Sequence, residues 1–390
     1  MIRRGESSRW WAITFAILCV TAVTTLSVTT PGLWISHAAQ PGGAYEYRTL
    51  LTVANGTGAL AMGALACWRP VRVLGVAMTA VYTLLMTAAL ATGELGPALF
   101  LPLAVAGGGM KVCVWSLLLQ QVSTTERHLR SAAVLLGEIV ASVGYLFALG
   151  GLAPLLFALG PRASFALATA EAVLVGLTLM ALGAAPPADS SIRLPEGGFA
   201  RLVAPLLLVA VPAQIAASAM SGRLINPFDV LAFRPWLQAA SALVAAGVLL
   251  ALLLWLSLKS REPTLRVLAV ASFCGAGFSL LLLLSVPPLR AGWGVGPAFL
   301  VAFGIGIVSF SERLLLVLAC VATPPRLVPL LVAGWFVKDT LVSRWVAPLA
   351  DDARGDAGRT VAVTVVAAAL LAIAGLTAWS LAKRDWFKSV

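Results

Sequence analysis

The chain has 390 residues, of which 60% are hydrophobic and only 11% are charged, and its formal net charge is +11 at pH 7. A typical soluble domain is roughly 45–50% apolar and about 25% charged. A globule of this length cannot hide so much apolar surface, so the composition excludes a soluble domain, and with it coiled-coil, collagen-like and disordered chains. We interpret the sequence as that of an all-α polytopic membrane protein.

The basic surplus and the cysteines exclude further classes. In a soluble protein, 27 Lys and Arg against 16 Asp and Glu would suggest a nucleic-acid partner. In a membrane protein, the bias of basic residues toward cytoplasmic loops explains the surplus, so we expect no nucleic acid. The five cysteines lie in apolar stretches without a CxxC pair, and the chain has two histidines. We therefore expect packing cysteines, no metal site and no cofactor.

Twelve stretches are long and apolar enough to form bilayer-spanning helices, which take about 20 residues each. For the first stretch a cleaved signal peptide is the alternative, because arginines precede it and residues 36–38 are suitable for cleavage. Its apolar run is nearly a full span, however, whereas signal sequences have roughly 7–15 apolar residues. The predicted spans are residues 10–31, 49–67, 71–93, 96–122, 131–155, 163–183, 202–221, 236–257, 267–286, 296–321, 328–349 and 360–381.

Loop charge predicts the orientation of these spans. With a cytoplasmic N-terminus, sixteen Lys and Arg residues lie on the cytoplasmic side, seven lie outside, and the remaining four are within spans. A ratio above two to one satisfies the positive-inside rule, so both termini are predicted to be cytoplasmic. The longest polar connector is cytoplasmic, contains Pro186, Pro187 and Pro195, and divides the spans six and six. This connector divides the chain into three parts: an N-terminal bundle (1–183), a linker (184–201) and a C-terminal bundle (202–390).

This layout, together with short motifs, resembles the major facilitator superfamily in its bacterial form. Gly63-Ala64-Leu65-Ala66, followed by Arg69 and Arg72, is similar to the family's signature between spans 2 and 3, usually written GxLaDRxGRR. Here Cys67 stands where the signature has Asp, and Pro70 where it has Gly. Residues 126–132 are similar to the junction of spans 4 and 5, and residues 160–165 to the start of span 6. The span 5 pattern of drug–proton antiporters is absent.

The resemblance implies two pseudo-symmetric six-helix bundles around a cavity that opens alternately to each side of the bacterial cytoplasmic membrane. Spans 1, 4, 7 and 10 would line the cavity, and spans 2, 5, 8 and 11 would lie along the interface of the bundles. The resemblance assigns Cys67, Arg69 and Arg72 to the cytoplasmic gate. It further implies a protein that works as a monomer.

Charged residues inside the predicted spans are the candidate site residues. At the centre of a membrane helix a charge costs at least about 2.5–3.5 kcal/mol, so it faces a partner or a water-filled cavity. Glu171, in span 6, we interpret as a packing residue. The candidates are Lys111 in span 4, Glu138 in span 5, Glu312 and Arg313 in span 10, and Lys338 and Asp339 in span 11.

Lys111 follows three consecutive glycines and lies one helical turn before Trp115, on the same face. Glycines at this position allow another backbone or a substrate to approach closely. A cation beside an aromatic ring suits an anionic or partly aromatic ligand. The alternative is an internal ion pair between Lys111 and Glu138.

The other candidates also leave alternatives open. Glu138 is either a proton carrier or a member of a structural ion pair. The consecutive pairs Glu312-Arg313 and Lys338-Asp339 form either a buried neutral network or a network whose pairing changes as the cavity opens. Gln214 lies on a polar face of span 7 that either lines the cavity or joins helices.

Together these observations predict a secondary transporter of a small organic solute, coupled to protons. The alternatives are a membrane sensor that keeps the fold without transport, and a lipid flippase of the same fold. No nucleophile–base set, nucleotide loop or metal cluster is present in the sequence, so we do not expect an enzyme.

Overall fold

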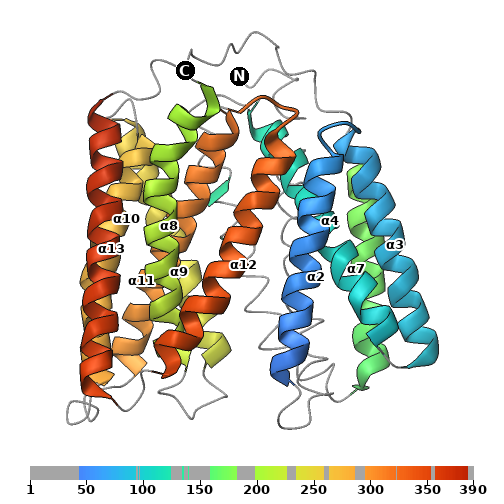
Figure 1. The fold of residues 1–390 in the computed structure, drawn as a ribbon, viewed down its shortest axis with the longest axis horizontal. Coiled ribbons are helices and arrows are strands. Elements are labelled where there is room, and N and C mark those ends of the chain that lie inside the picture. The colour runs from blue at the N-terminus through green and yellow to red at the C-terminus, as the bar shows by residue number, and fades with distance from the viewer. Residues whose placement is uncertain are drawn as a thin grey trace. The chain divides into compact units, whose positions relative to one another are not determined.

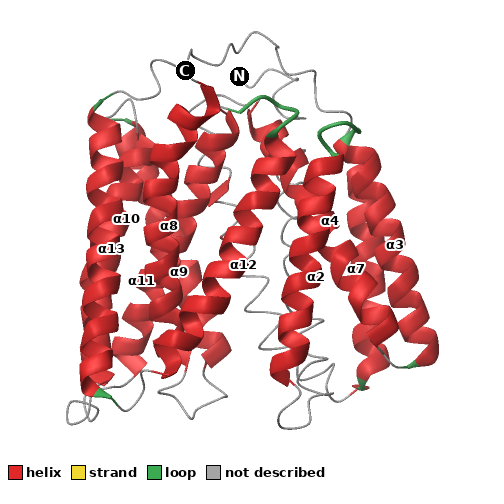
Figure 2. Ribbon diagram, in the orientation of Figure 1, coloured by secondary structure: helices red, strands yellow, loops and turns green. Residues whose placement is uncertain are grey.

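The structure is a computed structural model in which ten predicted spans are described as helices. No strand is present in the described residues (Figure 2). The first predicted span lies outside this part of the chain, as does the fifth apart from residues 134, 135 and 139. The described residues are 44–93, 95, 97–123, 134–135, 139, 159–181, 198–225, 234–258, 263–285, 295–321, 323–352 and 356–384.

The observed helices agree with the predicted spans to within a few residues (Figure 1). Several helices begin a few residues earlier than predicted, and one of them begins at Pro263, because proline has the backbone torsion that the first helical position requires. The elements are α2 (Ala44–Leu65), α3 (Val71–Thr92), α4 (Pro97–Ser123), α7 (Pro161–Ala181), α8 (Gly198–Ile225), α9 (Arg234–Ser257), α10 (Pro263–Ser279), the 3-10 helix η2 (Leu280–Ser285), α11 (Val295–Val321), α12 (Val328–Asp352) and α13 (Ala357–Lys383).

The chain is a multi-pass membrane protein. Six segments of the described part are each long and apolar enough to cross a bilayer, and three shorter apolar helical segments accompany them. Large apolar side chains such as Leu84 and Leu376 are exposed on these helices, as expected where the solvent is lipid. The six segments are Val71–Thr92, Ala98–Gln120, Ala240–Ser257, Pro263–Leu284, Val295–Cys320 and Ala357–Lys383.

The described helices belong to two compact units. Unit 1 contains α2, α3, α4, α7 and the N-terminal part of α12, through Val337. In this unit α4 packs on α2 and α3, and α3 packs on α7. Its fully buried large side chains include Phe100, Met110 and Phe165.

Glycines set the helix spacing in unit 1. A Cβ at Gly108 of α4 would overlap the carbonyl oxygen of Asn55, and one at Gly58 of α2 would overlap that of Val105. The backbones of α2 and α4 are therefore in direct contact. A Cβ at Gly63 would lie 2.6 Å from the Cβ of Ala333, so α12 approaches α2 closely as well.

Unit 2 contains α8, α9, α10, η2, α11, α13 and the remainder of α12, from Lys338. Here α11 packs on α8, α9 and α10, and α13 packs on α8 and α10. Phe278 and Phe303 join α10 to α11 through an edge-to-face contact with ring centroids 5.5 Å apart. Side chains on α11 are therefore enclosed by neighbouring helices.

Candidate functional site

Lys111 and Trp115 of α4 lie in unit 1 together with Phe336 of α12. The Nζ of Lys111 lies 4.4 Å from the centroid of the Phe336 ring. The Trp115 and Phe336 rings meet edge to face, with centroids 6.0 Å apart and an interplanar angle of 68°. Lys111 and Phe336 are half-buried, and Trp115 is buried. We call these three residues the Lys111 cluster.

Trp115 supplies this cluster with an available donor. Its indole Nε1 is buried and has no hydrogen-bond partner in the described structure. An unsatisfied buried donor costs about 1–3 kcal/mol, so an acceptor that reached it would be bound favourably. An ammonium group and an indole N–H on one helix face suit an anionic group with several acceptor oxygens.

The glycines before Lys111 serve helix packing. Gly108 allows the backbone of α2 to approach, as described above. The side chains nearest to Gly107 and Gly109 are Tyr82 and Met78, both from α3. The sequence left open whether these glycines admit another helix or a substrate. The structure shows that they admit other helices.

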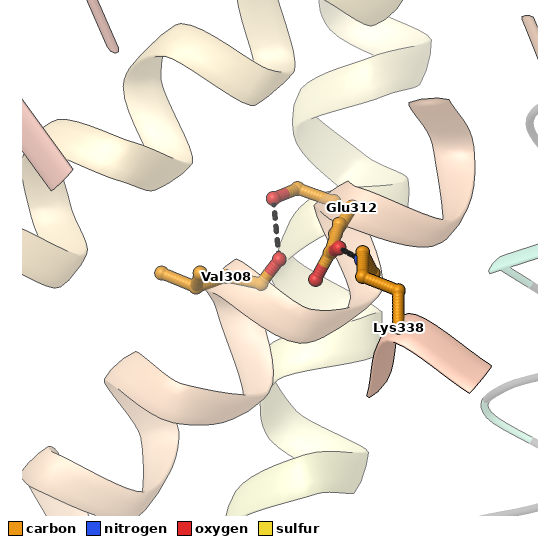
Figure 3. Close-up of polar contacts among 4 residues, drawn as sticks. Val308, Glu312 and Lys338 are labelled. Carbon is orange, nitrogen blue, oxygen red and sulfur yellow. Dashed lines mark hydrogen bonds and ion pairs between the residues drawn. The ribbon is translucent and has the colours of Figure 1, made fainter. Parts of the chain in front are cut away.

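Glu312 of α11 and Lys338 of α12 form an ion pair in unit 2 (Figure 3). The Lys338 ammonium donates to Oε1 of Glu312, and Glu312 is only 3% exposed. One residue earlier on α11, the Ser311 hydroxyl donates to the carbonyl oxygen of Val308 at 2.8 Å. Opposite charges buried side by side compensate each other, whereas a lone charge here would be costly.

The remaining predicted residues are placed as follows. The Arg313 guanidinium lies 5.5 Å from the ring centroid of Phe310, one turn earlier on α11. Gln214 is half-buried on α8. Asp339 follows Lys338 in α12, but its side chain is outside the described part of the structure. Glu138 is outside it altogether, so the predictions for these two carboxylates stay predictions.

Solved structures with a similar arrangement of helices include transporters. One is FucP, a major facilitator superfamily transporter in the outward conformation, with a TM-score of 0.69 and 14% identity over 94% of this chain and 98% of that one. A single-residue variant of the E. coli fucose:proton symporter FucP matches at the same TM-score and coverage, with 15% identity. The chain has the major facilitator fold. This confirms the resemblance drawn from its layout.

A third match to the major facilitator fold is a bacterial homologue of the iron transporter ferroportin in an outward-facing state. It has a TM-score of 0.68 and 13% identity, over 96% of this chain and 99% of that one. No protein-family model and no curated protein sequence matches the chain. The resemblance is therefore one of fold.

Arg72, a predicted gate residue of the major facilitator fold, binds the C-terminal end of α7 within unit 1. Its Nε donates to the carbonyl oxygen of Leu179 at 3.1 Å, and its Nη2 donates to that of Met180. The last carbonyls of a helix have no partners within the helix and carry a partial negative charge. Arg72 therefore acts as a charged cap on α7, a contact that the sequence motif did not reveal.

The opposite end of the α3–α7 pair has a related contact. Gly93 ends α3 with a φ of 76°, which favours glycine, and its N–H donates to the carbonyl oxygen of Ala89. A Cβ at Gly93 would lie 3.0 Å from Nε of Arg162, at the start of α7. Each of these antiparallel helices thus carries an arginine beside the C-terminal end of the other.

The other two predicted gate residues make fewer contacts. The Cys67 thiol donates to the carbonyl oxygen of Gly63 at 3.4 Å, one turn back on the chain. Arg69 is exposed.

Phe336 is the residue that sequence reasoning missed, because an apolar side chain in a membrane span carries no functional signal.

Replacing Arg72 by Met is expected to lower the free energy of unfolding by about 1.5–3 kcal/mol, the range for a hydrogen bond to a charged group. Methionine keeps the aliphatic part of the side chain but cannot donate, so the loss reports the hydrogen bonds to the carbonyl oxygens of Leu179 and Met180. Thermal unfolding of the purified protein in detergent measures it. The control, Arg69→Met, should unfold within about 0.5 kcal/mol of the wild type, because Arg69 is exposed. Equal effects of the two changes would contradict a specific role for Arg72.

Proposed function

We propose that the protein is a secondary active transporter of a small organic solute, coupled to protons as a symporter or an antiporter. The observation that carries the proposal is the Glu312–Lys338 ion pair, buried between helices of a membrane protein with the major facilitator fold. Ionisable residues inside membrane helices are costly and mark substrate and ion pathways. Transport needs no chemistry on the solute, so we propose no enzymatic step.

The proposed architecture has twelve transmembrane helices in two pseudo-symmetric bundles, residues 1–183 and 202–390, joined by the cytoplasmic linker 184–201. Both termini face the cytoplasm of a bacterial cell, and the protein works as a monomer in its cytoplasmic membrane. Ten helices that coincide with predicted spans, the charge of the loops and the major facilitator fold support this proposal. Alternating exposure of a central cavity is the corresponding mechanism.

For the substrate, we propose a small organic anion that binds at the Lys111 cluster. The ammonium of Lys111 attracts the anionic group, and the indole N–H of Trp115 donates to one of its oxygens. The Phe336 ring, which now lies against Lys111, offers an apolar surface to the rest of the solute. Gln214 and Arg313, both in unit 2, are further proposed substrate- or ion-binding residues.

We assign proton coupling to acidic residues within the membrane helices. A proton on Glu312 would remove the negative charge that now compensates Lys338, and the ion pair would open. Pairing that depends on protonation in this way links the proton to a change of conformation. Glu138 and Asp339 are the further proposed proton carriers. One of the structural neighbours is a fucose:proton symporter.

A sensor without transport is the second candidate function, and Cys67 favours it. The major facilitator signature has an acidic residue at this position, whereas here the Cys67 thiol donates to the carbonyl oxygen of Gly63 one turn back. A gate without its acidic residue is less strongly held. A sensor would bind a solute without carrying it across the membrane.

A thermal-shift screen of the purified protein against small organic solutes tests the proposal, because a solute that binds the folded state raises its unfolding temperature. We expect the hits to be organic anions. Lys111→Met should weaken their binding at least tenfold, since a charge-assisted hydrogen bond contributes about 1.5–3 kcal/mol. Trp115→Phe keeps an aromatic ring but removes the N–H, and should also weaken binding.

The matched control is Trp379→Phe, which changes an exposed indole on α13 and should leave binding unchanged. Unchanged affinity in both Lys111→Met and Trp115→Phe would contradict the assigned substrate site. Flux of a confirmed ligand into proteoliposomes then separates the two functions. Binding without flux would support the sensor.

A further inference from the structure

The C-terminal end of α13 and the start of α10 carry three basic residues. Lys383 and Arg384 are exposed, and Arg266 of α10 is half-buried. Within the described ranges, none of the three has an ion-pair partner. The Nζ of Lys383 lies 5.6 Å from the ring centroid of Trp379, so its side chain is held against the helix by a cation–π contact.

The register of the two helices places Arg266 near the other two cations. The helices α10 and α13 pack together (Figure 1), and a Cβ at Gly375 would lie 2.9 Å from Cε1 of Phe273. A Cβ at Gly275 would lie 3.4 Å from Leu371, so residue numbers rise on one helix as they fall on the other. The helices are therefore antiparallel.

Two turns from the Phe273–Gly375 contact, Arg266 and Ala382 lie on the faces that pack together. Arg266 is thus level with the residue before Lys383. All three cations belong to one end of a helix pair inside unit 2. We call Arg266, Lys383 and Arg384 the α10–α13 basic patch.

An apolar stripe leads away from this patch along α13. Ile373, Leu376 and Trp379 follow one another at helical spacing on the exposed side of the helix and end one turn before Lys383. Phe273, which contacts Gly375, is also exposed and adds to the stripe from α10. Tryptophan is typical of the boundary between lipid tails and headgroups, so the basic patch lies at headgroup level.

We propose that the α10–α13 basic patch binds the headgroup of an anionic phospholipid, whose acyl chains lie along the apolar stripe. The positive charges attract the phosphate, and the exposed Trp379 ring fits the carbonyl and glycerol region below it. A zwitterionic lipid could lie along the same stripe but would lack the net attraction. A free phosphate could meet the cations but would gain nothing from the stripe. The combination of patch and stripe therefore fits an anionic phospholipid.

Native mass spectrometry of the purified protein with phosphatidylglycerol or phosphatidylcholine tests the proposal. We expect tighter binding of phosphatidylglycerol, and affinity about fivefold weaker for each charge removed by Arg266→Gln, Lys383→Gln and Arg384→Gln. A variant that keeps the charges (Arg266→Lys, Lys383→Arg, Arg384→Lys) should retain the preference. If the triple glutamine variant keeps the wild-type preference for phosphatidylglycerol, the proposal is wrong.

Two controls separate this site from general surface charge. Arg359→Gln removes a cation at the other end of α13, where it pairs with Asp356, and Arg326→Gln removes an exposed cation elsewhere. Both variants should keep the preference for phosphatidylglycerol. If either lost as much of this preference as a variant of the α10–α13 basic patch, the proposed site would be wrong. Inorganic phosphate should not compete with phosphatidylglycerol at equal concentration. Effective competition would instead indicate a free-anion site.

Discussion

Replacement of Glu312 by Gln is expected to lower the unfolding temperature of the purified protein more than any other single change proposed here. The carboxylate is buried and compensates the charge of Lys338. Without it, the Lys338 ammonium loses this carboxylate, and the removal of one partner from a buried pair costs about 3–5 kcal/mol. Thermal unfolding in detergent, followed by tryptophan fluorescence, measures the loss.

The double variant Glu312→Gln, Lys338→Met should recover most of this stability, because both charges of the buried pair are then removed together. The matched control, Glu312→Gln with Lys383→Met, removes an exposed lysine instead and should not recover it. If the losses of stability caused by Glu312→Gln and Lys338→Met simply added up in the double variant, the two residues would not be coupled through an ion pair. The basis of the prediction would then be wrong.

The recovered double variant also isolates the role of Glu312 in coupling. Because this variant is folded, a loss of flux driven by a pH gradient cannot be attributed to misfolding. We expect proteoliposomes containing it to lose pH-driven flux of a ligand identified in the thermal-shift screen. Normal pH-driven flux would mean that Glu312 is not the coupling residue, while leaving the binding site at Lys111 untouched.

Replacement of Gly108 by Ala is also expected to destabilise the protein, with a loss of about 1–3 kcal/mol or more in the free energy of unfolding. The new methyl group would overlap the carbonyl oxygen of Asn55 in the backbone of α2, which cannot rotate away as a side chain could. The two helices must separate to accommodate it. Loss of stability in thermal unfolding measures the effect.

The control for Gly108→Ala is Gly247→Ala, in α9. A Cβ at Gly247 meets nothing within 4 Å, so only helix propensity changes, and alanine is favoured there by about 0.8–1.0 kcal/mol. The two substitutions are chemically identical and are expected to have opposite signs. If Gly108→Ala were as stable as the wild type, the close contact of α2 with α4 would be wrong.

The sequence by itself determined the helices and the class of the protein. Within lipid, a chain must satisfy its backbone hydrogen bonds internally, so long apolar runs become helices whatever their neighbours are. For this reason ten predicted spans coincide with observed helices, and the start of α10 could be corrected from Pro263 alone. The cost of a buried charge likewise singled out Lys111, Glu312 and Lys338 before any contact was known.

Only the tertiary structure decided which of these residues meet. Glu312 could have paired with its neighbour in the chain, yet its partner is Lys338 of another helix. Phe336 became part of the Lys111 cluster, and Arg72 a cap on α7, through contacts between segments far apart in the chain. Such contacts depend on the rotation of each helix about its axis and on close approaches like that at Gly108, which follow from packing against neighbours. Hydropathy fixes the length of a membrane helix, but it carries little information about which face meets which partner.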